Sequence, residues 1–171
     1  LKTSILYLKT KALYGIKAYM DANTLLDELV QGEPRNMSYQ IDRIVNHIAL
    51  HDYSKALILI DQAFQIDPVN DELLFLKIEC LIEGGLGIQE GVRLFSGSSF
   101  SYLKMKGVKE CEQKINTIRA QRTGDDDADF FITFLQLLID GKFDRVNELV
   151  TKIEEVKPET SNEYPKLGLY I

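Results

Sequence analysis

Two shortages in the sequence, of proline and of strand-like runs, indicate helices. Only four of the 171 residues are proline, and long alternating runs rich in Val and Thr are absent. Proline interrupts helices and β-branched residues favour strands, so together the two shortages favour an all-α chain with few breaks. Apolar residues make up 45% of the chain and charged residues 27%, which is typical of a folded domain rather than of a disordered segment.

Long apolar runs and cysteines are also scarce. No stretch reaches the roughly 18 apolar residues that a membrane-spanning helix needs, and the printed residues contain no signal-peptide pattern. The two cysteines, Cys80 and Cys111, have no Cys or His neighbour at metal-ligand spacing. They are compatible with a disulfide or with two free thiols, and we expect free thiols, as in a reducing compartment. The sequence therefore predicts a cytoplasmic protein without a membrane partner.

Motifs of catalysis and of phosphate binding are absent. There is no Gly-x-Gly-x-x-Gly, no phosphate-binding loop and no Cys–His pair, and the carboxylates show no spacing typical of a general acid and base. His47 and His51 are four residues apart, but Ile48 stands where the zinc-protease motif has Glu, and no third ligand is evident. The acidic run 125–129 lacks the calcium-loop spacing and favours a helix N-terminus instead. We therefore expect no enzyme activity, no cofactor and no metal.

Positive charge is in deficit, with 20 Lys and Arg against 26 Asp and Glu and a net charge of −6 at pH 7. A chain with this balance is not expected to bind nucleic acid directly. Segment 104–122 is a local exception, and its six basic side chains predict either a solvated helix face or a contact for an acidic protein surface. The six are Lys104, Lys106, Lys109, Lys114, Arg119 and Arg122.

Residues 1–36 form the first predicted region, which contains an apolar helix and a short second helix. Residues 2–20 are apolar almost all round, so we expect this first helix to be covered on several sides. Asn23 or Thr24 is a suitable N-cap for the second helix, which is predicted to reach Val30. Gly32 and Pro34 then interrupt the chain.

Residues 37–171 are predicted to form helix-hairpin repeats. Clear hairpins are expected at 38–68 and 127–158, and a degenerate hairpin at 70–95. An irregular insert is expected at 96–124, with a loop at 96–99 and a long helix at 101–121. Residues 161–171 begin a further, truncated repeat, and the first residue is Leu, so we expect the chain to be a fragment of a longer protein.

Two segments of the repeat region align without gaps, one from His51 to Pro68 and the other from Gly141 to Pro158. In both, an aromatic residue lies two residues into the turn, small or β-branched and apolar residues follow at matched spacing, and proline ends the helix. The matched positions are Tyr53, Ala56, Ile60 and Ala63 in the first segment and Phe143, Val146, Val150 and Ile153 in the second. This pattern resembles the second half of a tetratricopeptide repeat, in which small residues let helices approach and an aromatic plugs the hairpin.

The resemblance implies an all-α fold in which antiparallel helix hairpins stack as a short right-handed α-solenoid of nine or ten helices. The sequence also departs from the family pattern. His51 replaces the turn glycine, and Glu90 stands where a small apolar residue is expected. The two aligned copies are 141 − 51 = 90 positions apart, which is not a multiple of the family's period of roughly 34 residues.

The resemblance further implies a peptide-binding groove along the first helices of the hairpins. The expected groove residues are Phe75, Glu79, Ile82, Phe131, Ile132, Leu135, Leu138 and Ile139. The Lys, Arg and Asn side chains with which some family members clamp a carboxylate are missing at these places, so a chaperone tail is not the expected ligand. So apolar a stripe is too large to stay in contact with water, and either a partner or another helix of the same protein is expected to cover it.

Two functions follow as hypotheses. The first is a non-catalytic protein–protein interaction module that holds a partner segment in the apolar groove. The second is a regulatory or oligomerisation domain of a transcriptional regulator whose DNA-binding domain lies outside these residues. It rests on segment 6–15, which resembles the apolar helix before the repeats of winged-helix bacterial activators. The expected partner is accordingly either a protein segment or a second copy of the chain. A third reading, an accessory domain of an enzyme, would require a catalytic domain elsewhere in the protein.

Overall fold

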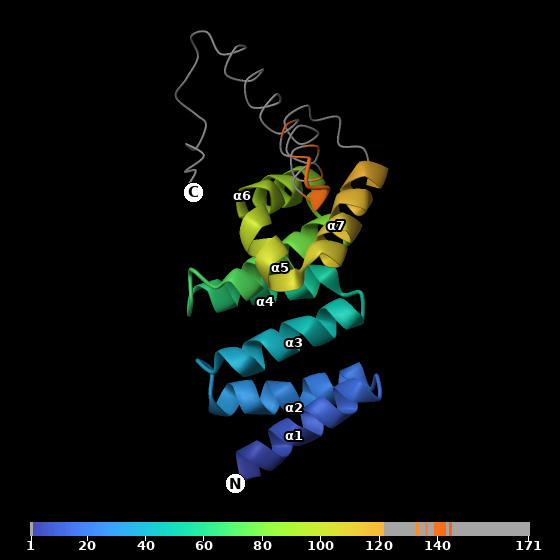
Figure 1. The fold of residues 1–171 in the computed structure, drawn as a ribbon. Helices are drawn as coiled ribbons and strands as arrows, with labels where there is room; N and C mark the ends of the chain where they lie inside the picture. The colour runs from blue at the N-terminus through green and yellow to red at the C-terminus, as the bar shows by residue number, and fades with distance from the viewer. Residues whose placement is uncertain (1, 122–132, 134–135, 137–138, 143, 145–171) are drawn as a thin grey trace.

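The computed structural model describes residues 2–121, 133, 136, 139–142 and 144, and it shows a stack of antiparallel helices (Figure 1). Over these residues the chain is all-helical apart from turns, and it contains no strand. The helices are α1 (Lys2–Gly15), α2 (Tyr19–Gly32), α3 (Met37–Ala49), α4 (Tyr53–Phe64), α5 (Asp71–Ile82), α6 (Ile88–Lys106) and α7 (Val108–Gln121). Within this part of the chain, no helix is both long and apolar enough to cross a membrane.

Each helix packs against the next one in the chain, and side chains of α1 also contact α3. Between α1 and α3, the rings of Tyr7 and Tyr39 lie 4.8 Å apart, and Lys11 Nζ approaches Asp42 Oδ2 to 2.6 Å. Helix α3 contacts α5 as well. Helices α1, α3 and α5 are therefore neighbours in the stack, and α1 lies at its N-terminal end (Figure 1).

Three of the turns between helices share one backbone conformation at a constant interval. Lys17, His51 and Gly85 have φ angles of 62°, 58° and 64°. Their spacing along the chain is equal, since 51 − 17 = 34 and 85 − 51 = 34. In the first two turns, the next residue donates its N–H to a carbonyl five residues back, which closes the end of the helix. The described chain thus contains three hairpins of one design, α1–α2, α3–α4 and α5–α6, whose turns recur with a constant period.

This period explains why the two copies aligned in the sequence, at His51 and Gly141, are not separated by a whole number of repeats. The turn at Gly141, which aligns with that at His51, also has a positive φ of 66°. It lies 141 − 85 = 56 positions after Gly85 because α6 has 19 residues and α7 follows it. The regular copies therefore lie on both sides of His51, and the one at Lys17 falls in the region expected to precede the repeats. Lysine at the first turn hid this copy, since a left-handed residue is usually Gly or Asn.

The cores of the first two hairpins repeat at the same interval as their turns. Ala22 and Ala56 occupy equivalent positions in the two hairpins, and both are fully buried. Leu26 and Ile60 are likewise equivalent and fully buried. Small residues at these positions let the two helices of a hairpin approach closely, and large apolar residues one turn later fill the space between them. A further core joins α5 to α6 and α7.

Helix α6 differs most from the sequence-based expectation, because the segment 96–99 is helical and not a loop. Phe95 and Tyr102 lie on one face of the continuous helix and are 1% and 6% exposed. The serines remain helical by bonding backwards, with Ser98 Oγ donating to the Leu94 carbonyl at 2.7 Å. Burial of the two aromatic rings outweighs the weak helix propensity of the Ser and Gly residues between them.

The long helix expected at 101–121 is divided at Gly107, where φ is 86°. Helix α6 ends at Lys106, and α7 begins at Val108. The segment expected to be an irregular insert is therefore helical as far as Gln121. Its apolar stripe of Cys111, Ile115 and Ile118 is buried against α5 and α6.

Candidate functional site

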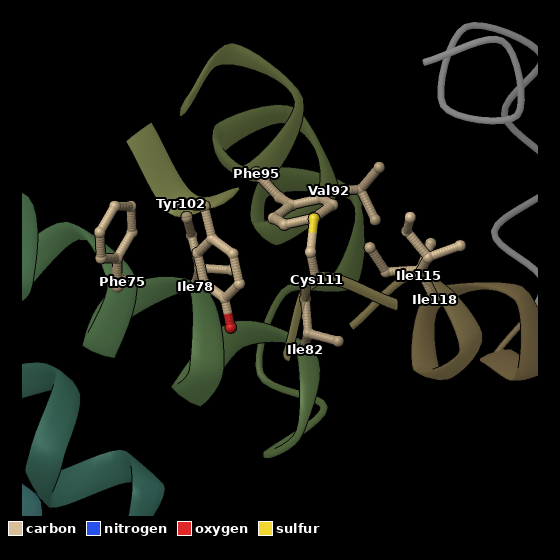
Figure 2. Packing of buried hydrophobic residues seen from close by; sticks show 9 residues of the cluster. All are labelled: Phe75, Ile78, Ile82, Val92, Phe95, Tyr102, Cys111, Ile115 and Ile118. Atoms are coloured by element: carbon tan, nitrogen blue, oxygen red, sulfur yellow. The ribbon is translucent and has the colours of Figure 1, made fainter. Parts of the chain in front are cut away.

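Two residues of the predicted groove, Phe75 and Ile82, are buried within the chain and do not line an open surface. Phe75 is 3% exposed and Ile82 is fully buried. Figure 2 shows Phe75 beside Tyr102 of α6 and Ile82 beside Cys111 of α7. The ring of Tyr102 packs edge-on against Phe75 with centroids 5.0 Å apart. At these two positions the prediction of a partner-binding groove is wrong, and the stripe is instead covered by other helices of the same chain, because α6 continues beyond residue 95 and α7 packs over α5.

Glu79 is the one predicted groove residue on α5 that keeps contact with solvent. It is half-buried and shares a helix face with the exposed residues Glu72 and Glu83, at spacings of seven and four residues. Burial raises the pKa of the Glu79 carboxyl, and the Glu83 charge adds to this effect, while Lys114 opposes it. The exposed face of α5 is therefore acidic rather than apolar.

Lys114 belongs to the segment in which the sequence predicted a solvated basic face, but it is buried. Its side chain is 8% exposed, and its Nζ donates a hydrogen bond to Oε1 of Glu83, the residue that follows α5. Lys104, Lys106 and Lys109 are exposed in agreement with the expectation. Lys114 thus ties α7 to α5 and is not free to meet a partner.

The remaining predicted groove residues lie C-terminal to α7. Ile139 packs against the same cluster of α5, α6 and α7 residues as Phe75. Phe131, Ile132, Leu135 and Leu138 lie outside the described residues, as does the acidic run 125–129. A groove lined by these residues stays a prediction.

The two histidines at metal-like spacing have separate partners. His47 Nδ1 lies 3.2 Å from Asp52 Oδ2, and His51 Nδ1 lies 3.2 Å from the Tyr53 hydroxyl. His51 occupies the left-handed position of the α3–α4 turn, as its place in the sequence suggested. Among the residues that the structure describes, no three His, Cys, Asp or Glu side chains are grouped to hold a metal ion.

Both cysteines are free thiols and buried, which confirms the expectation of unpaired cysteines. Burial raises the pKa of Cys80 to about 12 and that of Cys111 to about 11. Since the thiolate is the reactive form, neither cysteine is activated as a nucleophile at neutral pH. They serve as small apolar residues of the core.

The surface that sequence analysis missed is on α1, opposite the side that packs into the fold. Thr10 is 2% exposed, and Leu6 and Tyr7 pack against a cluster that includes Leu26 and Leu29. On the other side, Ile5 is 60% exposed and Leu8 is 68% exposed. Ile5, Leu8, Lys9 and Ala12 are all exposed on this side and are called the outer face of α1.

The sequence carried a signal for this surface, because residues 2–20 are apolar almost all round and were expected to be covered on several sides. The described residues cover α1 on one side only, through its contacts with α2 and α3. Two further apolar side chains close to its C-terminal end, Ile16 and Met20, are 75% and 72% exposed. Exposed apolar side chains grouped on one helix face, as Ile5 and Leu8 are, are typical of an interaction site.

No family model and no curated protein matches the chain. The resemblance to the tetratricopeptide family therefore rests on the residues and their packing alone.

Proposed function

We propose that the chain is a non-catalytic protein–protein interaction module, built as a short right-handed solenoid of nine or ten helices of the tetratricopeptide type. The constant interval between the turns at Lys17, His51 and Gly85 equals that family's period of roughly 34 residues and supports the assignment. The aromatic residue of the α3–α4 turn, Tyr53, also supports the assignment to this repeat type. Tyr53 packs so closely on Gly84 that a Cβ atom there would lie 2.7 Å from the Tyr53 ring carbon Cγ.

One observation carries the proposal, namely that no helix of the described part of the chain packs on the outer face of α1. The residues 34 positions after Ile5 and Ala12 are Tyr39 and Asn46, which are 7% and 2% exposed. The same surface is thus covered in the second hairpin and left open in the first. Covering it would remove apolar side chains from water at about 25 cal/mol per Å². In a stack of repeats, this open end is where another helix fits.

The experiment compares wild-type chain with Leu8→Glu and with a matched control, Ile58→Glu. Ile58 is 53% exposed on α4, so both substitutions place a charge on an exposed helical position. Both variants should stay within about 0.5 kcal/mol of wild-type stability. Proteins recovered with the wild-type chain, quantified by mass spectrometry, should be lost with Leu8→Glu and kept with Ile58→Glu. Equal recovery with all three chains would refute the proposed surface.

The alternative, a regulatory or oligomerisation domain of a transcriptional regulator, requires a second copy to cover this face. Residues 1–20 contain four lysines and no acidic residue. A symmetric pairing through α1 would bring these like charges together, which is unfavourable. The charge of α1 therefore favours a different partner over a second copy.

A further inference from the structure

An ion pair recurs where one hairpin stacks on the next. Arg43 of α3 lies 2.6 Å from Asp27 of α2, and Lys77 of α5 lies 2.9 Å from Asp61 of α4. The two cations recur at the interval of the turns, since 77 − 43 = 34, and so do the two carboxylates, since 61 − 27 = 34. Each hairpin after the first therefore meets its predecessor through a cation on its first helix and an aspartate on the preceding helix.

The same position on α1 is 43 − 34 = 9, which is Lys9. Lys9 is exposed and forms no ion pair with any described residue. Ile5 and Ala12 on the outer face match buried residues of both later hairpins at the same interval, and Leu8 matches the half-buried Asp42 and the buried Leu76. Ile5 corresponds to Tyr39 and Leu73, which are 7% and 0% exposed. The outer face of α1 thus carries the cation and the apolar residues of a stacking surface, and no helix of the described residues packs on it.

Helices α2 and α4, which carry the paired aspartates, show which side chains pack on such a stacking surface. In both, an apolar residue follows the paired aspartate by three positions, as Val30 follows Asp27 and Phe64 follows Asp61. Val30 and Phe64 are partly buried against the cores of their hairpins, and the ammonium of Lys77 lies 5.9 Å from the centroid of the Phe64 ring. The repeated requirement is a helix with one carboxylate beside an apolar stripe.

We infer that the outer face of α1 binds an amphipathic helix of a partner protein, which presents a carboxylate to Lys9 and an apolar side chain one turn away to Ile5 and Leu8. The inference rests on the proposed interaction function and names the partner's chemistry. Lys2, Lys9 and Lys17 are exposed around this end of the stack, so an acidic helix is complementary to it in charge as well as in shape.

Other occupants fit less well. In a second copy of the chain, Asp27 and Asp61 are already paired with Arg43 and Lys77 of that copy, so neither aspartate is free to pair with Lys9. An anionic bilayer would meet the rest of the chain, which carries −6 − 4 = −10 once the four lysines of residues 1–20 are set aside. An extended anionic surface would repel that charge. A single helix docked at the end of the stack would be repelled much less, because salt screens charges that lie far from it.

The test uses the full 171-residue chain and a peptide of residues 19–32, held helical by a covalent staple because short helices are marginal in water. This peptide reproduces α2, the helix on which α3 stacks, and its matched control carries Asp27→Lys. The wild-type peptide should bind the chain several-fold more tightly than the control peptide, and the Lys9→Asp chain should reverse this preference. Leu8→Glu should abolish binding of both peptides, whereas Ile58→Glu should leave binding unchanged.

Reversal of the preference by Lys9→Asp establishes the carboxylate contact. If Leu8→Glu abolishes binding but both peptides bind every other chain equally, the surface stands and the carboxylate assignment is wrong. If Leu8→Glu has no effect, the proposed function at this surface fails too. A wild-type dimer that becomes a folded monomer with Leu8→Glu, measured by light scattering, would overturn the inference in favour of a second copy. Leu8-dependent binding to phosphatidylserine vesicles without peptide binding would overturn it in favour of a membrane.

Discussion

At the scale of single residues, close packing and partial burial make the sharpest demands on side-chain identity. Gly84 lies at the end of α5 with the Tyr53 side chain directly against it. Glu79 keeps a half-buried carboxyl among charges from two helices. For Gly84 and for Glu79 we predict the effect of a substitution on stability and compare it with the same substitution at a control residue.

Gly84→Ala should destabilise the chain, because the new Cβ would lie 2.7 Å from the Tyr53 side chain. Overpacking of this kind typically costs about 1–3 kcal/mol. Gly97→Ala is the control, since this glycine of α6 has nothing within 4 Å of a built Cβ. Alanine there should stabilise the helix by roughly 0.5–1 kcal/mol. Urea titrations of the two variants should shift in opposite directions, and equal shifts would contradict the packing at Gly84.

Glu79→Gln should stabilise the chain near neutral pH and have little effect in acid. Burial raises the pKa of Glu79 in the folded state, so the unfolded chain loses this proton first as the pH rises. The ionised carboxyl then opposes folding at all pH values above its folded pKa. Below the unfolded pKa of about 4.3 the carboxyl is neutral in both states, and the substitution removes no charge.

Thermal unfolding of Glu79→Gln at several pH values measures this difference, with Glu72→Gln as an exposed control on the same helix. A stabilisation that is the same at acid and neutral pH would exclude desolvation of the Glu79 carboxylate as its cause.

At the scale of elements, the hairpin α3–α4 was the most accessible to sequence analysis and α6 the least. The α3–α4 hairpin has a clear apolar periodicity, a turn at His51 and a proline after its second helix. For α6 the local signal was misleading, because Ser and Gly between residues 96 and 99 predict a loop. The continuity of α6 depends on contacts of Phe95 and Tyr102 with residues distant in the sequence, which local periodicity does not report.

The helical state of residues 96–99 predicts slow amide exchange. Their N–H groups lie inside α6, between two buried aromatic anchors. Hydrogen exchange measured by NMR should show these amides protected to a degree similar to that of Val92 and Phe95. Exchange as fast as in the turn around Gly107 would mean that the segment is a loop, as the sequence alone had suggested.

At the scale of the whole molecule, the all-helical repeat-like architecture could be predicted, but the place of its regular copies could not. The copy formed by α1 and α2 was hidden because lysine occupies the left-handed turn position at residue 17. The burial of Phe75 and Ile82 followed from the unexpected length of α6 and the return of α7. The apolar character of residues 2–20 was visible, but only the stack shows which side of α1 stays uncovered.

The central claim is that the outer face of α1, which none of the described residues covers, is open for a partner. Methyl NMR with a soluble gadolinium chelate, which broadens signals of accessible methyl groups, tests this claim most directly. The methyls of Ile5 and Leu8 should be broadened as strongly as those of Ile58, which is 53% exposed, while the fully buried Ile44 and Ile78 stay sharp. Sharp signals from Ile5 and Leu8 would show that the chain covers this face itself, and would contradict the account.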